Sequence, residues 1–316
     1  MASVVMPTID VQDLQTTSAP VLVEFEGLRL PVHYRPGSNQ TLIVIFHGAV
    51  DQAKRPLPFF QPHFTVAGGA HQLAISDPTL SRSTELKAAW FAGAHDLPLQ
   101  QVLPHFFVRI AEILKVKRTI YFGASAGGFA AMFYSHAHPN SLALVANPQI
   151  NLLNYLEAPI SLYRAQCWPL ALDNQALASL ACVNLADLYA KSVPNFVCLL
   201  NAAGDRYHLY GQTLELAARL KPEARNRIIL HSDFYGIPGH SGSIPMQACT
   251  PWLKAAMYAP NLYADTILTK LHQLRAPASA AIPAPAAPAR TASTGPDPED
   301  LRLTDAVAQW QLQRRA

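Results

Sequence analysis

Six short apolar segments constrain the fold more than any other feature of this sequence. They are 41–46 (TLIVIF), 71–76 (HQLAIS), 118–123 (RTIYFG), 142–147 (LALVAN), 195–200 (NFVCLL) and 226–231 (NRIILH). Each is mostly apolar, short and rich in residues that favour strands, which predicts a buried strand. Longer stretches, several with helical periodicity, separate them. We therefore expect an α/β fold with a mainly parallel central sheet and helices on both of its faces.

The remaining segments of the main domain, 21–274, complete this picture. Residues 21–34 alternate apolar and polar side chains around Gly27, which predicts an N-terminal antiparallel hairpin. Residues 148–194 are far longer than an ordinary connection between a strand and a helix, so we expect a small helical cap inserted there. Residues 1–20 are interpreted as an N-terminal extension. Helices are expected at 98–115, 126–138, 208–220, 245–257 and 261–274.

The composition changes at Arg275. Residues 275–297 are rich in Ala, Pro and Ser and predict a flexible linker rather than part of a core. Residues 298–316 follow as an amphipathic C-terminal helix, with Trp310 on its apolar face. Two interpretations remain open for this helix: a marginal tail helix, or a segment that docks on its own chain or on a protein partner.

Composition and charge exclude several classes of function. The chain has 316 residues, of which 50% are hydrophobic and 14% charged, enough apolar material for one large core. A net charge of +3 without a dense Lys/Arg run argues against nucleic-acid binding. No apolar run is long enough to span a membrane, and the N-terminus lacks the pattern of a secretory signal. We therefore expect a cytoplasmic protein.

The cysteines point to the same compartment. Cys167, Cys182, Cys198 and Cys249 form no CxxC pair, and none has a histidine at the spacing of a metal site. We expect reduced thiols, no metal and no organic cofactor.

The segment Gly123-Ala-Ser125-Ala-Gly127 carries the strongest chemical signal. It has the pattern GxSxG and lies where the strand at 118–123 meets the helix at 126–138. This context is typical of a nucleophile elbow, a sharp turn that lifts a serine above the edge of a sheet. The turn also directs the N–H of Ala126 and the positive end of the helix toward a reacting oxygen. We expect Ser125 to be a nucleophile.

A serine nucleophile needs a histidine base and a carboxylate that orients it, here in the chain order Ser, acid, His. Asp205 follows the strand at 195–200 and is the expected acid; a helix N-cap is its alternative role. Asp187 and Asp233 are weaker candidates, because Asp187 lies in the cap and Asp233 is too near the last strand.

The expected base is His240, which follows the last strand in a loop of small residues (GHSGS). His208 is the next candidate, since it follows Asp205 by three residues and can line the site without being the base. His231 is interpreted as a strand-end residue.

The fourth part of the site is the turn after the strand at 41–46. Hydrolases use an HG-type turn here to present a second N–H to the oxyanion. Ala49 is the expected donor, with Val50 as the alternative, and His47 is suited to brace the turn. The candidate substrate-binding residues at the same edge of the sheet are His47, Gly48, Asp77, Trp90, Asn147, Gln149 and His208.

These segments together resemble a known family. The segments FHGAV, GASAGGFAAM and ANPQ, the Gly-Asp-x-x-His run at 204–208 and the Gly-His pair at 239–240 are similar to those of the α/β-hydrolase superfamily. More narrowly, they resemble bacterial hydrolases encoded near surface-polysaccharide genes, relatives of the accessory secretory proteins that acetylate glycans. The resemblance covers about 20–260 and implies the α/β-hydrolase fold. The GHxxP loop of that family reads HSGSIP here, with extra residues before the proline.

The resemblance also implies a triad of Ser125, Asp205 and His240. The sequence thus predicts a serine-dependent hydrolase of a small acyl or glycan O-acyl ester that forms an acyl-enzyme. A glycan O-acyltransferase with the same triad is the first alternative. A binding protein that keeps the fold without activity is the second.

Overall fold

A nine-stranded sheet is the centre of the computed structural model, which describes residues 6–65, 68–235 and 244–275. The strand order is β1-β2-β3-β5-β4-β6-β7-β8-β9. The strands are β1 Thr8–Asp10, β2 Val21–Phe25, β3 Leu28–Arg35, β4 Thr41–Phe46, β5 His71–Ile75, β6 Arg118–Ala124, β7 Leu142–Ala146, β8 Phe196–Ala202 and β9 Ile228–Asp233. Each of the six apolar segments singled out in the sequence forms one of the strands β4 to β9, so this prediction is confirmed.

The pairing follows the expected pattern of parallel strands after an antiparallel start. β2 and β3 form an antiparallel hairpin, and β3 also runs antiparallel to β5. All pairs from β5 through β4, β6, β7 and β8 to β9 are parallel. The mainly parallel sheet with an N-terminal hairpin is therefore confirmed.

Alternation along each strand builds two cores, one on each face of the sheet. On β4, Leu42, Val44 and Phe46 belong to one buried cluster, and Ile43 and Ile45 belong to the other. Since both faces are covered, the whole strand is buried and its sequence is apolar throughout.

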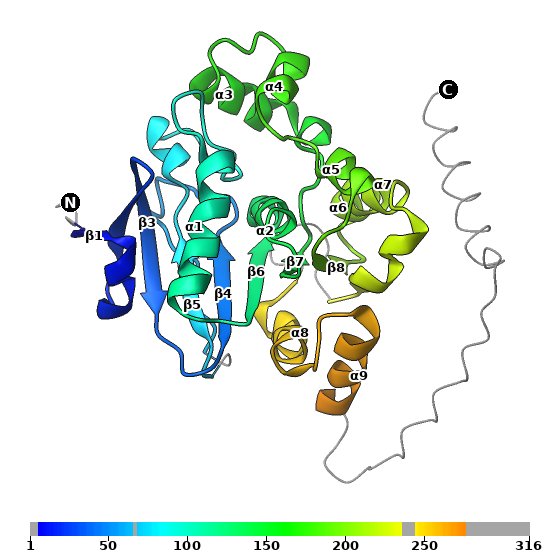
Figure 1. Cartoon of the computed structure of the whole chain (residues 1–316). Coiled ribbons are helices and arrows are strands. Elements are labelled where there is room, and N and C mark those ends of the chain that lie inside the picture. The colour runs from blue at the N-terminus through cyan, green and yellow to red at the C-terminus, as the bar shows by residue number, and fades with distance from the viewer. Residues whose placement is uncertain (1–5, 66–67, 236–243, 276–316) are drawn as a thin grey trace, which may run out of the picture. The chain divides into compact units, whose positions relative to one another are not determined.

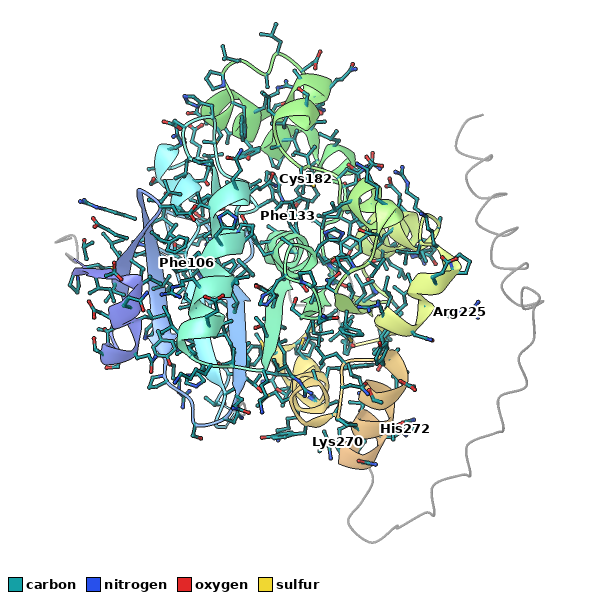
Figure 2. The ribbon with its side chains drawn as sticks, viewed as in Figure 1. Phe106, Phe133, Cys182, Arg225, Lys270 and His272 are labelled. Carbon is teal, nitrogen blue, oxygen red and sulfur yellow. The ribbon has the colours of Figure 1, made fainter. Side chains whose placement is uncertain are left out.

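Helices cover both faces, as Figure 1 shows. α1 and α2 pack on the face that carries the larger core, which Phe106 of α1 enters (Figure 2). α8 and α9 pack on the other face. Their bounds are α1 Leu99–Ile113, α2 Ala126–His136, α8 Met246–Tyr258 and α9 Ala264–Arg275.

A small helical cap lies between β7 and β8, as the length of this stretch predicts. It consists of the 3-10 turn η3 (Leu152–Asn154) and the helices α3 (Glu157–Cys167), α4 (Asn174–Leu180) and α5 (Leu185–Lys191). In Figure 1, α3 and α4 lie on the side toward which β4 and β6 point, the side where the site is expected.

The structure differs from the sequence analysis at the N-terminus. Residues 8–16, assigned there to an extension, join the fold. β1 pairs with β2, and the 3-10 helix η1 (Val11–Thr16) buries Val11 and Leu14 against the core.

A second difference lies within 208–220, where a continuous helix was expected. The chain instead forms α6 (Arg206–His208), a π-helical turn η4 (Leu209–Thr213) and a short α7 (Leu214–Ala217). Two further 3-10 helices are η2 (Pro78–Arg82) and η5 (Pro222–Arg227).

Other expectations concern the surface and the termini. The linker at 275–297, except for its first residue, and the C-terminal helix at 298–316 lie outside the described residues. In the part of the chain that is described, no helix has the length and apolar character needed to cross a membrane. The four cysteines are free thiols, and three of them are buried.

Candidate active site

The candidate site lies where the direction of the strand order reverses. After β4 the chain adds β5 on one side, and β6 then pairs on the other side of β4. Phe46 at the end of β4 is in register with Gly123 of β6. The turn after β4 and the turn after β6 therefore emerge side by side, at the kind of crevice where α/β sheets bind ligands.

Ser125 has a strained backbone at this crevice. Its φ is 53° and its ψ is −117°, values that a non-glycine residue rarely adopts. Backbone hydrogen bonds hold it on both sides. Its N–H donates to the carbonyl of Ala146 at 3.0 Å, and its carbonyl accepts from the N–H groups of Gly128, Gln149 and Phe129 at 3.0, 3.1 and 3.3 Å. A strained serine between a strand and a helix is the geometry of a nucleophile elbow.

Close backbone contacts explain the glycines of the motif. A Cβ atom on Gly123 would lie 2.0 Å from the carbonyl oxygen of Gly127. One on Gly127 would lie 2.6 Å from the carbonyl oxygen of His47 and 2.7 Å from that of Phe46. A side chain on Gly123 would push α2 away from β6, and one on Gly127 would push α2 away from the end of β4, so both glycines are required for the turn.

A buried amide faces the hydroxyl of Ser125. The Nε2 of Gln149 donates to Ser125 Oγ at 3.3 Å, and the indole N–H of Trp90 donates to Gln149 Oε1. Because an indole N–H can only donate, the Gln149 atom that faces Trp90 must be the oxygen. Trp90 therefore fixes the amide so that it presents its donor side to Ser125.

Asp205 reaches the same region from β8. It follows the strand by three residues and caps α6, where its Oδ1 accepts from the N–H of His208 at 3.2 Å. The same Oδ1 lies 3.0 Å from Nδ1 of His208, and Oδ2 accepts from Nδ2 of Asn147 at 3.2 Å. Asn147 and Gln149 are two residues apart, so one segment contacts both Asp205 and Ser125. The N-cap role and a place in the site are thus compatible.

The turn after β4 is braced by His47. Its Nδ1 donates to the carbonyl of Gly48 at 2.7 Å, and its Nε2 accepts from the N–H of Asp77 at 3.0 Å. Both ring nitrogens are therefore used by the backbone. Burial lowers the pKa of His47 to about 4, a shift that its bond to Gly48 partly opposes.

Asp77 is buried beside this histidine. Its carboxylate accepts from the N–H of Thr79 at 3.0 Å and from that of Phe91 at 2.7 Å. Burial raises its pKa to about 6, although these hydrogen bonds lower it. These contacts tie the turn of His47 to the loop that carries Trp90 and Phe91.

The two candidate donors in this turn differ in what they contact. The N–H of Val50 donates to the carbonyl of Lys87 at 2.7 Å. Ala49 is exposed, and within the described ranges no acceptor is recorded for its N–H. Ala126 is the first residue of α2, where an N–H has no acceptor inside the helix. The N–H groups of Ala49 and Ala126 therefore remain the two candidates for binding an oxyanion.

Two tyrosines that the sequence analysis did not name lie beside the candidate residues. The ring of Tyr155 lies 6.4 Å from those of Trp90 and His208 and 6.0 Å from that of Tyr207. Burial raises the pKa of Tyr155, a hydrogen bond with Gln149 lowers it, and the charge of Asp205 raises it further. A tyrosine in a long connection has no local signal for this role; only the tertiary contacts identify it.

The structure brings some predicted residues together and not others. Gln149 contacts Ser125, and Asn147 and His208 contact Asp205. Trp90 contacts Gln149. All four side chains are buried. His240, the expected base, lies outside the described residues.

The alternative acids lie at the surface. Asp187 is on α5, where it forms an exposed ion pair with Arg219, and Asp233 ends β9 with an exposed side chain. Among the described residues no cluster of three or more His, Cys, Asp or Glu side chains could hold a metal ion.

Comparisons with known proteins bear on the fold. No family model matches the sequence, and no curated protein is similar enough to match. Among solved structures, the capsule O-acetyltransferase of Neisseria meningitidis serogroup A is similar with a TM-score of 0.50 and 15% identity, over 74% of this chain and 96% of that one. Acylaminoacyl peptidase of Pyrococcus horikoshii is similar with a TM-score of 0.54 and 15% identity, over 79% of this chain and 44% of that one.

A third solved structure, 2,6-dihydroxy-pseudo-oxynicotine hydrolase, gives a TM-score of 0.51 and 13% identity, over 78% of this chain and 70% of that one. At these identities the comparison concerns the fold. It agrees with the mainly parallel sheet described above and with the fold that the sequence resemblance implies. The chain has the α/β-hydrolase fold.

Proposed function

We propose that the protein is a serine-dependent acyl-ester hydrolase that acts on a small acyl ester or a glycan O-acyl ester. The observation that carries this proposal is Ser125 itself. Its backbone is held at φ 53° between β6 and α2, and its hydroxyl accepts a hydrogen bond from a fixed amide donor. Backbone strain of this kind persists only where surrounding structure enforces it, and it concentrates at functional sites.

In the proposed mechanism, Ser125 attacks the ester carbonyl and forms an acyl-enzyme. The N–H groups of Ala126 and Ala49 bind the oxyanion, which is the largest electrostatic contribution in acyl transfer. His240 accepts the serine proton and gives it to the alcohol, which leaves as the ester C–O bond breaks. It later accepts a proton from the water or sugar hydroxyl that attacks the acyl-enzyme, and Asp205 holds the imidazole in the required tautomer. His240 is assigned from its place after the last strand and from the family resemblance.

The aromatic side chains near Asp205 support a substrate with a ring-shaped alcohol portion. Tyr155 is half-buried, and Tyr207 and Tyr210 are 42% and 45% exposed at the start of the helical segment that follows Asp205. Exposed aromatic rings suit the apolar face of a sugar.

A glycan O-acyltransferase is the second candidate. This chain matches 96% of the length of the capsule O-acetyltransferase. The same triad serves both reactions, because the acyl-enzyme can be attacked by water or by a sugar hydroxyl.

The first experiment tests the nucleophile. The full chain is incubated with p-nitrophenyl acetate and, separately, with a fluorophosphonate probe that labels activated serines. We expect turnover and labelling in the wild type, loss of both in Ser125→Ala, and no change in Ser161→Ala, a partly exposed serine of α3. Equal labelling of the wild type and Ser125→Ala would refute the assignment, and an unlabelled wild type would favour the binding-protein alternative.

The second experiment separates the base from its neighbour and hydrolysis from transfer. His240→Gln should lower kcat by roughly 10⁶-fold, as the loss of a triad histidine does, and His208→Gln by much less. An acetylated sugar or an acyl thioester is then supplied as donor with a free sugar as acceptor. Free acetate as the main product indicates a hydrolase, and acetylated acceptor indicates a transferase.

A further inference from the structure

The segment from Asn147 to Asn151 connects the two halves of the candidate site. At its start, Asn147 accepts from the N–H of Ala202 at 2.8 Å and donates to Asp205. In its middle, Gln149 donates to Ser125 Oγ. The end of the segment must be held as firmly as its start if the amide of Gln149 is to stay at hydrogen-bond distance from the hydroxyl.

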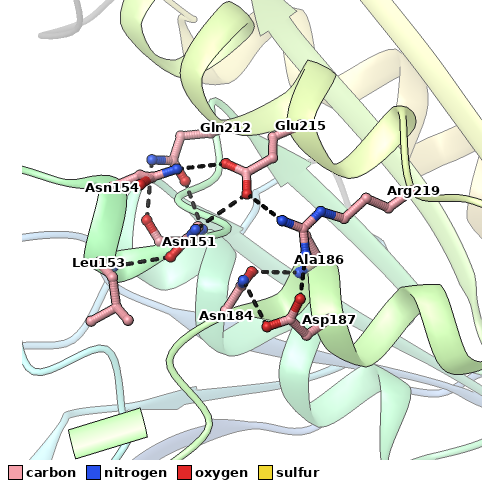
Figure 3. Close-up of polar contacts among 9 residues, drawn as sticks. All are labelled: Asn151, Leu153, Asn154, Asn184, Ala186, Asp187, Gln212, Glu215 and Arg219. Atoms are coloured by element: carbon pink, nitrogen blue, oxygen red, sulfur yellow. Dashed lines mark hydrogen bonds and ion pairs between the residues drawn. The ribbon is translucent and has the colours of Figure 1, made fainter. Parts of the chain in front are cut away.

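Gln212 holds that end. Its Oε1 accepts from the N–H of Ile150 at 2.8 Å and from that of Asn151 at 2.7 Å. Its Nε2 donates to the carbonyl of Asn151 at 3.2 Å. The side chain is fully buried, so these bonds replace water for both partners. Figure 3 shows Gln212 beside Asn151 and the polar groups around it.

The backbone around Gln212 departs from a regular helix. Leu209–Thr213 form a π-helical turn, an element that usually occurs as a single insertion in a helix and often at a functional site. The segment of α6 and η4 begins at Asp205, so one continuous stretch carries the acid at its start and Gln212 further along. It thereby contacts both ends of the segment 147–151.

Figure 3 also shows a second set of contacts at Asn151, made by Glu215. Glu215 accepts from Nδ2 of Asn151 at 3.2 Å and from Nδ2 of Asn154 at 2.7 Å. Arg219 bonds to Glu215 and to Asp187 of the cap helix α5. These contacts join the cap to α7 but do not reach Gln149, whereas Gln212 bonds directly to the N–H of Ile150, the residue next to Gln149.

We propose that Gln212 is a positioning residue of the active site. By fixing the backbone of Ile150 and Asn151, it holds the amide of Gln149 within hydrogen-bond distance of the Ser125 hydroxyl. Gln212 does not touch the substrate. Its effect passes through Gln149, and the kinetic part of this inference rests on the proposed function.

The variant Gln212→Met tests the proposal, because it keeps the size of the side chain and removes all three hydrogen bonds. Thr213→Val is the matched control: it removes a buried hydrogen bond, that of Thr213 Oγ1 to Asn201 at 2.7 Å, from the same turn. The first readout is the indole ¹H–¹⁵N NMR signal of Trp90, assigned with Trp90→Phe. We expect Gln212→Met to shift this signal and Thr213→Val to leave it in place.

This NMR readout does not depend on activity, so it tests the positioning role even if the proposed function fails. An unshifted Trp90 signal in folded Gln212→Met would overturn the proposal. If Gln212→Met does not fold, Gln212→Asn takes its place, since the shorter amide cannot reach both N–H groups and should give the same shift.

The kinetic readout separates positioning from general stability. Gln212→Met should lower kcat for p-nitrophenyl acetate by about 10- to 100-fold with an unchanged KM, the effect of a small displacement at a reacting group. Gln212→Glu should have a kcat close to that of the wild type. A buried protonated carboxyl can accept from the N–H groups of Ile150 and Asn151 and donate to the carbonyl of Asn151, as the amide of Gln212 does. In a Gln149→Ala background, Gln212→Met should have no further effect on kcat. Additive losses would contradict the proposal.

Discussion

The pH dependence of stability provides a sharp test of the turn that holds Ala49. The His47 ring is 2% exposed, its Nδ1 carries the proton that Gly48 accepts, and its Nε2 accepts from Asp77. Only a neutral ring can do this, because protonation would set a second N–H against the N–H of Asp77. Burial accordingly lowers the pKa of His47 to about 4 from its ordinary 6.5.

The magnitude follows from this shift. A base whose pKa is lower in the folded state contributes stability that is fully present above pH 6.5 and is lost as the pH falls from 6.5 to about 4. At about 1.4 kcal/mol for each pH unit, the free energy of unfolding that depends on His47 changes by roughly 3 kcal/mol over this range.

The perturbation is His47→Gln, which removes the titration and leaves an oxygen that can accept from the N–H of Asp77. Urea denaturation of both proteins is measured at pH 4, 5, 6.5 and 7.5. We expect the stability advantage of the wild type over the variant to grow by roughly 3 kcal/mol between pH 4 and 6.5. His272→Gln, an exposed position on α9 (Figure 2), serves as the control and should show no such change. An advantage that is the same at every pH would refute a neutral, buried His47.

Three further predictions concern neighbouring groups. Burial raises the pKa of Asp77 to about 6 from its ordinary 3.8. The free energy of unfolding of the wild type should therefore fall by roughly 3 kcal/mol relative to that of Asp77→Asn as the pH rises from 3.8 to about 6. This trend with pH is opposite to the one expected for His47. Gly127→Ala should cost about 1–3 kcal/mol in urea denaturation and abolish fluorophosphonate labelling, whereas Gly68→Ala, which has open space around it, should change neither. Asp205→Asn should lower kcat for p-nitrophenyl acetate by roughly 10⁴-fold in a protein that still folds, and near-normal turnover would remove Asp205 from the triad.

The strands could be predicted because parallel strands covered on both faces must be apolar along their whole length. Leu42 to Phe46 illustrate this, since neighbouring residues enter different cores. β1 could not be predicted: it has only three residues, and its pairing with β2 defines it. The π-helical turn could not be predicted either, because the side chains at 208–220 fit a regular helix locally. Gln212 bonds to Ile150 and Asn151, which are distant from it in the sequence.

The candidate site was predictable to a different degree at each position. Ser125 lies in a local sequence motif. Its glycines are required because a side chain in their place would clash with neighbouring backbone, so the strained turn could be anticipated from the sequence. Gln149 could be placed at the correct edge of the sheet as a polar residue after β7, but its contact with Ser125 depends on the whole architecture. Tyr155 lies in a connection without periodicity, where no sequence signal distinguishes it from an ordinary loop residue.

The fixed amide of Gln149 constrains how Ser125 can react. A serine hydroxyl has one proton to donate and two lone pairs. Because Trp90 takes the oxygen of Gln149, the amide offers Ser125 only donors, and the serine proton must point to a different acceptor. This is the orientation that a separate base requires. In the proposed mechanism, the same Gln149 N–H would still face the ester oxygen after acylation, whether water or a sugar hydroxyl attacks next. Under that proposal Gln149 serves hydrolysis and transfer equally, and the choice between them depends on groups that face the acceptor. Tyr155 and Tyr207, whose rings pack together beside His208, are aromatic candidates for such groups.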